Sequence, residues 1–255
     1  MSHKILYVSA ALAASVAASA HAAPVNQVSY ASLTGTQLVT FDDLAGGSAP
    51  GTNYDSIVTS NGVGLGEHFV GQTVGVSGSF DTLSGSPTGP LTLAVGTPGH
   101  NLNIFSFSTN VLTGLGPAGF PSFDAIGEGA FAVQFSSDQS EFGFQLVGGD
   151  GGTAFVSFFN AAGGLIDSIS LSSLANADYG FSRDGGVKDI RGISISNNDL
   201  GGIGFDNLKF DVKSIFVPRV PETSTWAMML LGFGAVGYAM RRRQVGFGSM
   251  RTAAA

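Results

Sequence analysis

The middle of this 255-residue chain is dominated by short runs in which large apolar residues alternate with small or polar ones. The clearest are residues 131–135 (FAVQF) and 142–146 (FGFQL). A period of two places alternate side chains on opposite faces of a β-strand, so these runs predict strands with one buried face. The chain has no cysteine, so no disulfide can supplement the stability of that buried face. A packed all-β fold follows.

Similar runs recur along the chain and are separated by clusters of Gly, Ser, Pro, Asn and Asp, which are typical of turns. About nine to twelve short antiparallel strands are expected, in a jelly-roll-like sandwich of two sheets. Helical spacing is weak, and residues 166–179 are the only stretch where we expect a helical turn. The other predicted strands cover residues 38–41, 102–107, 154–159, 165–171, 190–195 and 203–210.

The charge of the chain is negative and unevenly distributed. Eleven basic and 18 acidic residues give a net charge of −7. Residues 23–182 contain 12 acids and no Lys or Arg, whereas six basic residues lie between 183 and 219. An acidic surface repels phosphate backbones, which excludes nucleic acid as a partner. Anionic polysaccharide is disfavoured too, except through a metal bridge or the basic strip at 183–219.

The N-terminus has the pattern of a secretory signal peptide. Lys4 precedes an apolar run that ends near Ala20, and small residues at positions 20 and 22 suit a cleavage site after Ala22. We therefore predict a signal peptide at 1–22 and an exported domain at 23–217. The alternative is an N-terminal membrane anchor, although the run is short for a span of ~20 residues.

The C-terminus has an uncharged stretch of 15 residues, Trp226–Met240, followed by three arginines. As a helix it would be ~22 Å long against a ~30 Å hydrocarbon core, so spanning needs the preceding residues and snorkelling arginines. The Gly-rich pattern here matches G-x-G-x-x-G, but small residues for close helix packing explain it better than a dinucleotide site. The predicted membrane helix includes Met228, Met229, Gly232, Phe233, Gly234 and Gly237.

The order of residues in this region resembles the PEP-CTERM protein-sorting signal, in its variant with Trp-Ala after the Pro-Glu-Pro. Thr223 replaces the usual third Pro, and residues 244–255, predicted as a cytoplasmic tail, exceed the family's usual length. An ordinary C-terminal anchor is the alternative. The residues that carry the resemblance, and the predicted sorting and processing residues, are Val220, Pro221, Glu222, Trp226, Ala227, Arg241, Arg242 and Arg243.

The resemblance implies a Gram-negative bacterium and an exported protein held transiently in the inner membrane. It further implies processing near Pro221-Glu222 by an exosortase, in a setting of exopolysaccharide production. The expected destination is the cell surface or the extracellular matrix. The predicted function is therefore non-enzymatic, structural or adhesive.

A second hypothesis is a carbohydrate-binding module with a structural calcium ion. The opening FDDL (41–44) and the closing GFDNLKF (204–210) are similar to those of exported sandwich domains in PEP-CTERM proteins and of jelly-roll carbohydrate-binding modules. If the first and last strands are neighbours, Asp42, Asp43 and Asp206 can approach one another and supply the oxygens that calcium prefers. Solvated turn acids are the alternative, and no other cofactor is expected.

Sugar platforms are aromatic, but we expect the Phe stripes to form the core. Tyr30, Tyr54 and Tyr179 are the better platform candidates.

A third hypothesis is a secreted hydrolase. The exported part has two histidines, His68 and His100, but no G-x-S-x-G elbow and no H-E-x-x-H motif. We therefore predict no catalytic residues. The discriminating observation is whether either histidine lies in a cleft within hydrogen-bonding reach of a serine or a carboxylate.

Overall fold

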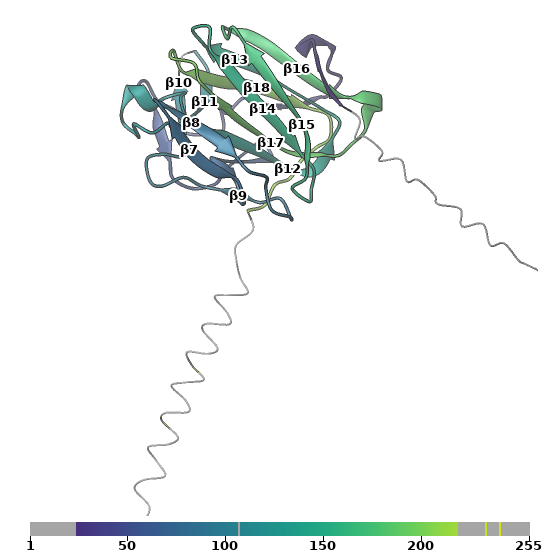
Figure 1. Cartoon of the computed structure of the whole chain (residues 1–255), viewed down its shortest axis with the longest axis horizontal. Coiled ribbons are helices and arrows are strands. Elements are labelled where there is room, and N and C mark those ends of the chain that lie inside the picture. The colour runs from purple at the N-terminus through teal and green to yellow at the C-terminus, as the bar shows by residue number, and fades with distance from the viewer. Residues whose placement is uncertain (1–23, 107, 219–232, 234–239, 241–255) are drawn as a thin grey trace, which may run out of the picture. The chain divides into compact units, whose positions relative to one another are not determined.

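The structure is a computed structural model that describes residues 24–106, 108–218, 233 and 240 (Figure 1). The chain divides into two compact units, one ending at Phe216 and the other beginning at Val217. Residues 24–216 of the first unit form a β-domain with no α-helix, in which the connections between strands include three short 3₁₀ turns. These turns are η1 (Tyr30–Ser32), η2 (Phe123–Ala125) and η3 (Asp184–Gly186).

The larger of two main sheets has eight antiparallel strands. Its strand order is β1-β16-β13-β18-β11-β10-β3, and β2 also pairs with β18. The first strand, β1, therefore pairs with β16, and the second strand, β2, pairs with the last strand, β18. The strands are β1 (Val25–Val28), β2 (Gln37–Val39), β3 (Thr52–Tyr54), β10 (Leu102–Ser106), β11 (Asn110–Gly114), β13 (Glu141–Gly148), β16 (Ala177–Arg183) and β18 (Ile203–Phe210).

The second main sheet has six antiparallel strands in the order β15-β14-β17-β12-β5-β4. Two small two-stranded sheets, β6-β9 and β7-β8, come from the segment 68–94. The strands are β4 (Val58–Ser60), β5 (Val63–Gly66), β6 (His68–Phe69), β7 (Thr73–Ser77), β8 (Phe80–Ser84), β9 (Leu93–Ala94), β12 (Phe131–Gln139), β14 (Thr153–Phe159), β15 (Leu165–Ser172) and β17 (Ile190–Asn197).

Phenylalanine rings join the inner faces of the two main sheets. Phe131 on β12 meets Phe205 on β18 with ring centroids 4.5 Å apart. Phe158 on β14 meets Phe181 on β16 at 5.3 Å, and Phe135 meets Phe210 at 5.1 Å. All six rings are almost fully buried. The alternating Phe runs are therefore core, as predicted, because period two directs every second side chain into the space between the sheets.

A smaller cluster covers the outer face of the six-stranded sheet. Phe69, Leu91 and Leu93 pack there against Ala132 and Phe159. Phe69 and Leu91 can pack this closely on the sheet because residue 192 is a glycine. A Cβ at Gly192 would lie 2.5 Å from both Leu91 Cδ2 and Phe69 Cζ. The segment 68–94 is thereby held against the sheet.

Two expectations about local structure were wrong. The part of the chain that the structure describes contains 18 strands, not nine to twelve, because many strands between 52 and 94 are only two to five residues long. Residues 166–179 contain no helical turn: they form most of β15 and the start of β16. Tertiary pairing of Ile169 and Leu171 with β14 outweighs the weak helical spacing. The all-β, antiparallel class is confirmed.

The predicted membrane helix at 226–240 lies outside the described residues, apart from Phe233 and Met240. These two residues have helical backbone conformation and exposed side chains. A search of the described residues for a helix long and apolar enough to span a bilayer found none.

Replacing Gly192 by Ala should lower the free energy of unfolding by about 1–3 kcal/mol, because the new methyl group overlaps Phe69 and Leu91. Urea unfolding of the full chain measures this change. Gly47→Ala is the matched control, since the nearest atom to its added Cβ would be 3.7 Å away. Equal stability of the two variants would contradict the packing described above.

Candidate functional site

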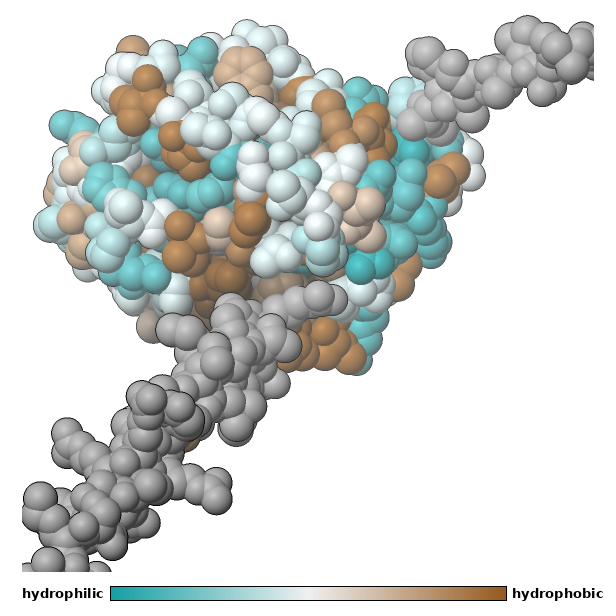
Figure 2. All heavy atoms as spheres, turned by 60° about the horizontal axis from the view of Figure 1, so that its bottom comes forward, coloured by the Kyte–Doolittle hydropathy of each residue, from teal (hydrophilic) through white to brown (hydrophobic). Residues whose placement is uncertain are grey.

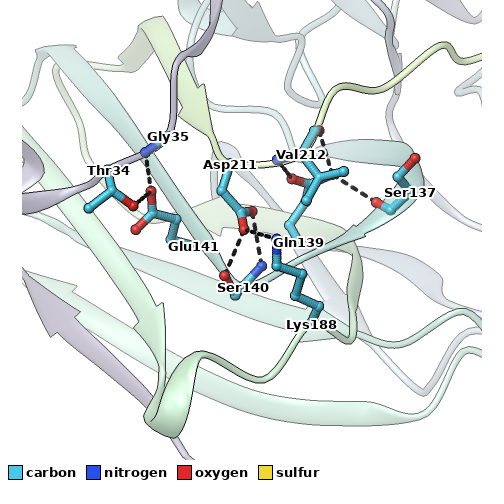
Figure 3. Close-up of polar contacts among 9 residues, drawn as sticks. All are labelled: Thr34, Gly35, Ser137, Gln139, Ser140, Glu141, Lys188, Asp211 and Val212. Atoms are coloured by element: carbon cyan, nitrogen blue, oxygen red, sulfur yellow. Dashed lines mark hydrogen bonds and ion pairs between the residues drawn. The ribbon is translucent and has the colours of Figure 1, made fainter.

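The last residues of the domain, 211–216, run along β12 and β13 and are called the exit strap here. The buried side chain of Gln139 holds its first half: Oε1 accepts from the Val212 amide at 2.7 Å, and Nε2 donates to the Val212 carbonyl at 3.0 Å (Figure 3). One side chain thus satisfies both backbone groups of Val212, as a neighbouring strand would.

Asp211 opens the strap and is bound from two sides. Its carboxylate accepts from the Ser140 amide at 3.0 Å and the Ser140 hydroxyl at 2.7 Å, and it pairs with Lys188 at 3.1 Å (Figure 3). Burial alone would raise the pKa of Asp211, but these hydrogen bonds and the ammonium hold it below its ordinary value. Beside it, Glu141 accepts hydrogen bonds from Thr34 and from the Gly35 amide.

The second half of the strap is fixed as firmly. Ser214 Oγ accepts from the Ser136 amide at 2.8 Å, and Ser136 Oγ accepts from the Ile215 amide at 2.7 Å. The Phe216 amide donates to the Gly62 carbonyl at 2.8 Å. The Phe216 ring lies over Gly64, where a Cβ would come within 2.4 Å of it. The chain is therefore hydrogen-bonded to the domain up to Phe216.

Four residues, 217–220, separate Phe216 from the predicted processing residues Pro221 and Glu222. The predicted sorting residues, from Val220 to Arg243, lie outside the described residues. Sequence reasoning had not identified the strap, because its anchors are isolated polar side chains with no motif around them.

A comparison with protein families identifies the motif in this C-terminal segment. The family model of the PEP-CTERM protein-sorting motif matches residues 219–243, which contain every predicted sorting residue. A comparison with curated proteins found no match. The chain thus carries a PEP-CTERM sorting motif, which implies export through the membrane and exosortase-dependent sorting to the cell surface.

The carboxylates predicted to bind calcium do not gather at one point. The strands that carry them are neighbours, since β2 pairs with β18. However, Asp43 accepts from the Ser60 hydroxyl at 2.5 Å and the Asn61 amide at 3.2 Å. Asp206 accepts from the Thr109 hydroxyl at 2.9 Å. Burial raises the pKa of Asp206, and the negative charge of Asp42 adds to the shift. Among the described residues no group of three or more acids or histidines is placed to hold a metal ion.

Neither histidine faces a nucleophile. His68 Nδ1 lies 2.8 Å from Glu67 Oε2, and His100 Nδ1 lies 3.3 Å from the Gly116 carbonyl. In the described part of the chain no serine hydroxyl contacts either ring. The His68–Glu67 contact satisfies the distance part of the test for a hydrolase, which asked for a serine or a carboxylate within reach of a histidine. A Ser-His-Asp triad would also need a serine beside the ring.

The predicted tyrosine platform is also not exposed. Tyr30 and Tyr54 donate their hydroxyls to the carbonyls of Asn207 and Ala45, each at 2.8 Å. Tyr179 packs on Phe144 with centroids 5.5 Å apart. All three residues are half-buried.

Two buried carboxyl groups, those of Asp81 and Glu128, have no ion-pair partner among the described residues. Burial raises the pKa of Asp81 to about 6, partly offset by the Ala130 amide. Burial also raises the pKa of Glu128 to about 7, and one of its carboxylate oxygens is buried without a hydrogen-bond partner. Both groups therefore take up a proton at a higher pH in the fold than exposed carboxyl groups do.

Replacing Gln139 by Ala should remove both hydrogen bonds to Val212 and cost about 1–3 kcal/mol of stability. Hydrogen exchange at the Val212 amide should accelerate, and mass spectrometry of peptides covering the exit strap measures this. Gln27→Ala, at an exposed position on β1, serves as control. Unchanged exchange in Gln139→Ala would show that the strap is held by other contacts.

Stability should rise as the pH falls from 8 to 5. Asp81 and Glu128 have folded-state pKa values above their unfolded values, so the folded state binds protons first on acidification. Asp81→Asn should stabilise the domain by ~1–3 kcal/mol at pH 8 and by much less at pH 5. Thermal unfolding across this range tests it, with the exposed Asp178→Asn as control. A variant that is less stable than wild type at pH 8 would overturn the assignment.

Proposed function

We propose that this chain is an exported, jelly-roll-like β-sandwich protein that an exosortase processes near Pro221-Glu222. It passes through the inner membrane and remains at the cell surface or in the extracellular matrix in a structural or adhesive role. The match of the sorting motif to residues 219–243 carries this proposal. The domain upstream is the cargo, and Trp226–Met240 is its transient membrane element.

The exit strap supports separate roles for the folded domain, which is the cargo, and for the sorting segment, which is the signal. The last backbone hydrogen bond of the domain is made by Phe216, and the processing residues begin at Pro221. The domain can therefore keep its complete fold while the enzyme acts on the segment that follows. The described strands of the two main sheets all lie between Val25 and Phe210.

The proposed role is non-enzymatic. The contacts of His68 and His100 with a neighbouring carboxylate and a carbonyl are structural, and they support this role. Polysaccharide of the matrix is the partner that the setting implies. A calcium-assisted carbohydrate-binding module remains the alternative, and loss of polysaccharide binding on addition of a chelator would favour it.

The sorting role predicts separate effects of two sets of substitutions in the producing cell. Replacing Arg241, Arg242 and Arg243 by Glu should remove the cytoplasmic stop and shift the protein out of the membrane fraction. Replacing Pro221 and Glu222 by Ala should leave membrane insertion intact and make the unprocessed form accumulate. Immunoblots of membrane, surface and medium fractions measure both effects.

The control for these experiments is Thr223→Pro, which restores the usual third motif residue and should maintain or increase processing. Unchanged fractionation of the arginine variant, together with unchanged processing of the Pro221/Glu222 variant, would rule out the proposed sorting role.

A further inference from the structure

The outer face of β15, β14 and β17 carries a regular array of serines. Their register places Ser168, Ser157 and Ser194 in one row across three adjacent strands. In the next row Ser170 and Ser196 flank a phenylalanine, Phe155. Neighbouring strands lie ~4.8 Å apart, so each row presents side chains at a regular spacing. The five serines are called the serine face below.

The alternation of the strands produces this array. Ile193 and Ile195 point into the core, so Ser194 and Ser196 point outward. Ala154 and Val156 are fully buried, and Phe155 between them is 45% exposed. An exposed aromatic ring in the middle of a hydroxyl surface has no role in the core of the domain.

Several hydroxyls of the serine face are free to bind a ligand. Ser157 and Ser168 hydrogen-bond to each other at 2.9 Å, which leaves further lone pairs on both oxygens. Ser194 accepts from Gln72 Nε2 at 3.2 Å. The Ser196 side chain makes no hydrogen bond to any residue that the structure describes, although the residue is only 7% exposed. The Ser196 oxygen is not among the buried polar atoms that lack a partner, so this hydroxyl stays accessible and can donate to and accept from a ligand.

The β7-β8 hairpin converts this face into a groove. In Figure 1 the hairpin is drawn in blue beside β17, and the two elements are in contact. The groove has a volume of about 200 Å³ and is lined by Phe155, Gln72, residues 83–86 and four residues of the serine face, namely Ser157, Ser168, Ser194 and Ser196. This volume is below the roughly 300–1,000 Å³ of pockets that enclose a drug-sized ligand. The shape suits a short part of a long chain rather than a whole small molecule.

The groove carries no charge. Hydroxyls, an amide and apolar side chains line it, with no acid or base among them. The basic residues nearest in sequence are used elsewhere: Arg183 pairs with Asp189 and Arg191 with Asp138, at 2.7 and 2.8 Å. Figure 2 shows a surface of largely pale, intermediate hydropathy with separate brown and teal areas. An anionic polymer would therefore find no counter-charge.

We infer that the groove between the β7-β8 hairpin and the serine face binds a segment of a neutral polysaccharide. A pyranose ring has an apolar face of C–H bonds, which stacks on the Phe155 ring, and a rim of hydroxyls. The rim exchanges hydrogen bonds with Ser157, Ser196 and Gln72. This inference names a partner class for the proposed surface role and rests on that role for its biological setting.

The test is affinity electrophoresis of the full chain, in a detergent without a sugar headgroup, through gels that contain one soluble polysaccharide. The probes are β-glucan, galactomannan and arabinoxylan, with polygalacturonate as the anionic comparison. We expect retardation by at least one neutral polymer and none by polygalacturonate. Phe155→Ala should weaken binding roughly three- to tenfold, whereas Phe155→Tyr should retain it.

Phe123→Ala is the matched control, because Phe123 is also an exposed phenylalanine but lies in η2, outside the groove. Circular dichroism and thermal unfolding confirm that each variant is folded. No retardation by any neutral polymer, retardation by polygalacturonate alone, or equal binding by Phe155→Ala and the wild type would overturn the inference.

Fractionation of the Phe155→Ala variant in cells separates this inference from the sorting proposal. Normal processing with lost polysaccharide binding supports both proposals. Normal binding in the gel with failed sorting of the wild type would contradict the sorting proposal alone.

Discussion

The packing of phenylalanine rings between the two main sheets is the interaction on which the rest of the domain depends. Phe144 is at its centre and contacts Phe142, Tyr179, Phe181 and Phe205, with centroids 5.0–6.0 Å apart. Burial of each Phe contributes ~1.5–3 kcal/mol, and tilted or edge-on ring pairs add to it. Because the chain has no cysteine, this layer supplies stability that disulfides supply in cysteine-rich domains.

The same alternation that fills the core determines the outer surface. Apolar residues at every second position leave the intervening positions to face solvent, and here many of these are Ser or Thr rather than charged residues. Only 11% of the chain is charged. The domain therefore presents hydroxyls to its surroundings, a surface chemistry suited to a hydrated matrix of neutral polymers.

The exit strap, residues 211–216, connects the β-domain to the sorting motif at 219–243. Its side-chain anchors include Gln139, Ser136 and Ser140, all on or next to β12, and the Gly62 carbonyl accepts from the Phe216 amide. Among the described residues these anchors end at Phe216, and residues 217–220 separate Phe216 from the predicted processing residues Pro221 and Glu222.

The sequence was sufficient to predict the features that depend on local pattern. The runs at 131–135 and 142–146 form β12 and β13, and the sorting motif was recognisable from the order of its residues. The short strands at 52–94 were not predictable, since two to five residues carry too little pattern.

The site residues show a similar division. The neighbouring positions of β2 and β18 followed the expected topology, but the separate hydrogen bonds of Asp43 and Asp206 depend on Ser60 and Thr109, far away in the sequence. The serine face was visible as the repeats SISLS (168–172) and ISIS (193–196), which we had interpreted only as strands. The strap could not be foreseen, because Gln139 has no distinguishing sequence context.

We propose that the C-terminal segment is a sorting signal that is removed from an independently folded domain. Intact-mass spectrometry of the mature protein, from cells with and without the exosortase, tests it most directly. We predict a C-terminus near Pro221-Glu222 only when the enzyme is present, with residues 23–216 retained. A mature protein that keeps Trp226–Arg243 in both strains would contradict the claim.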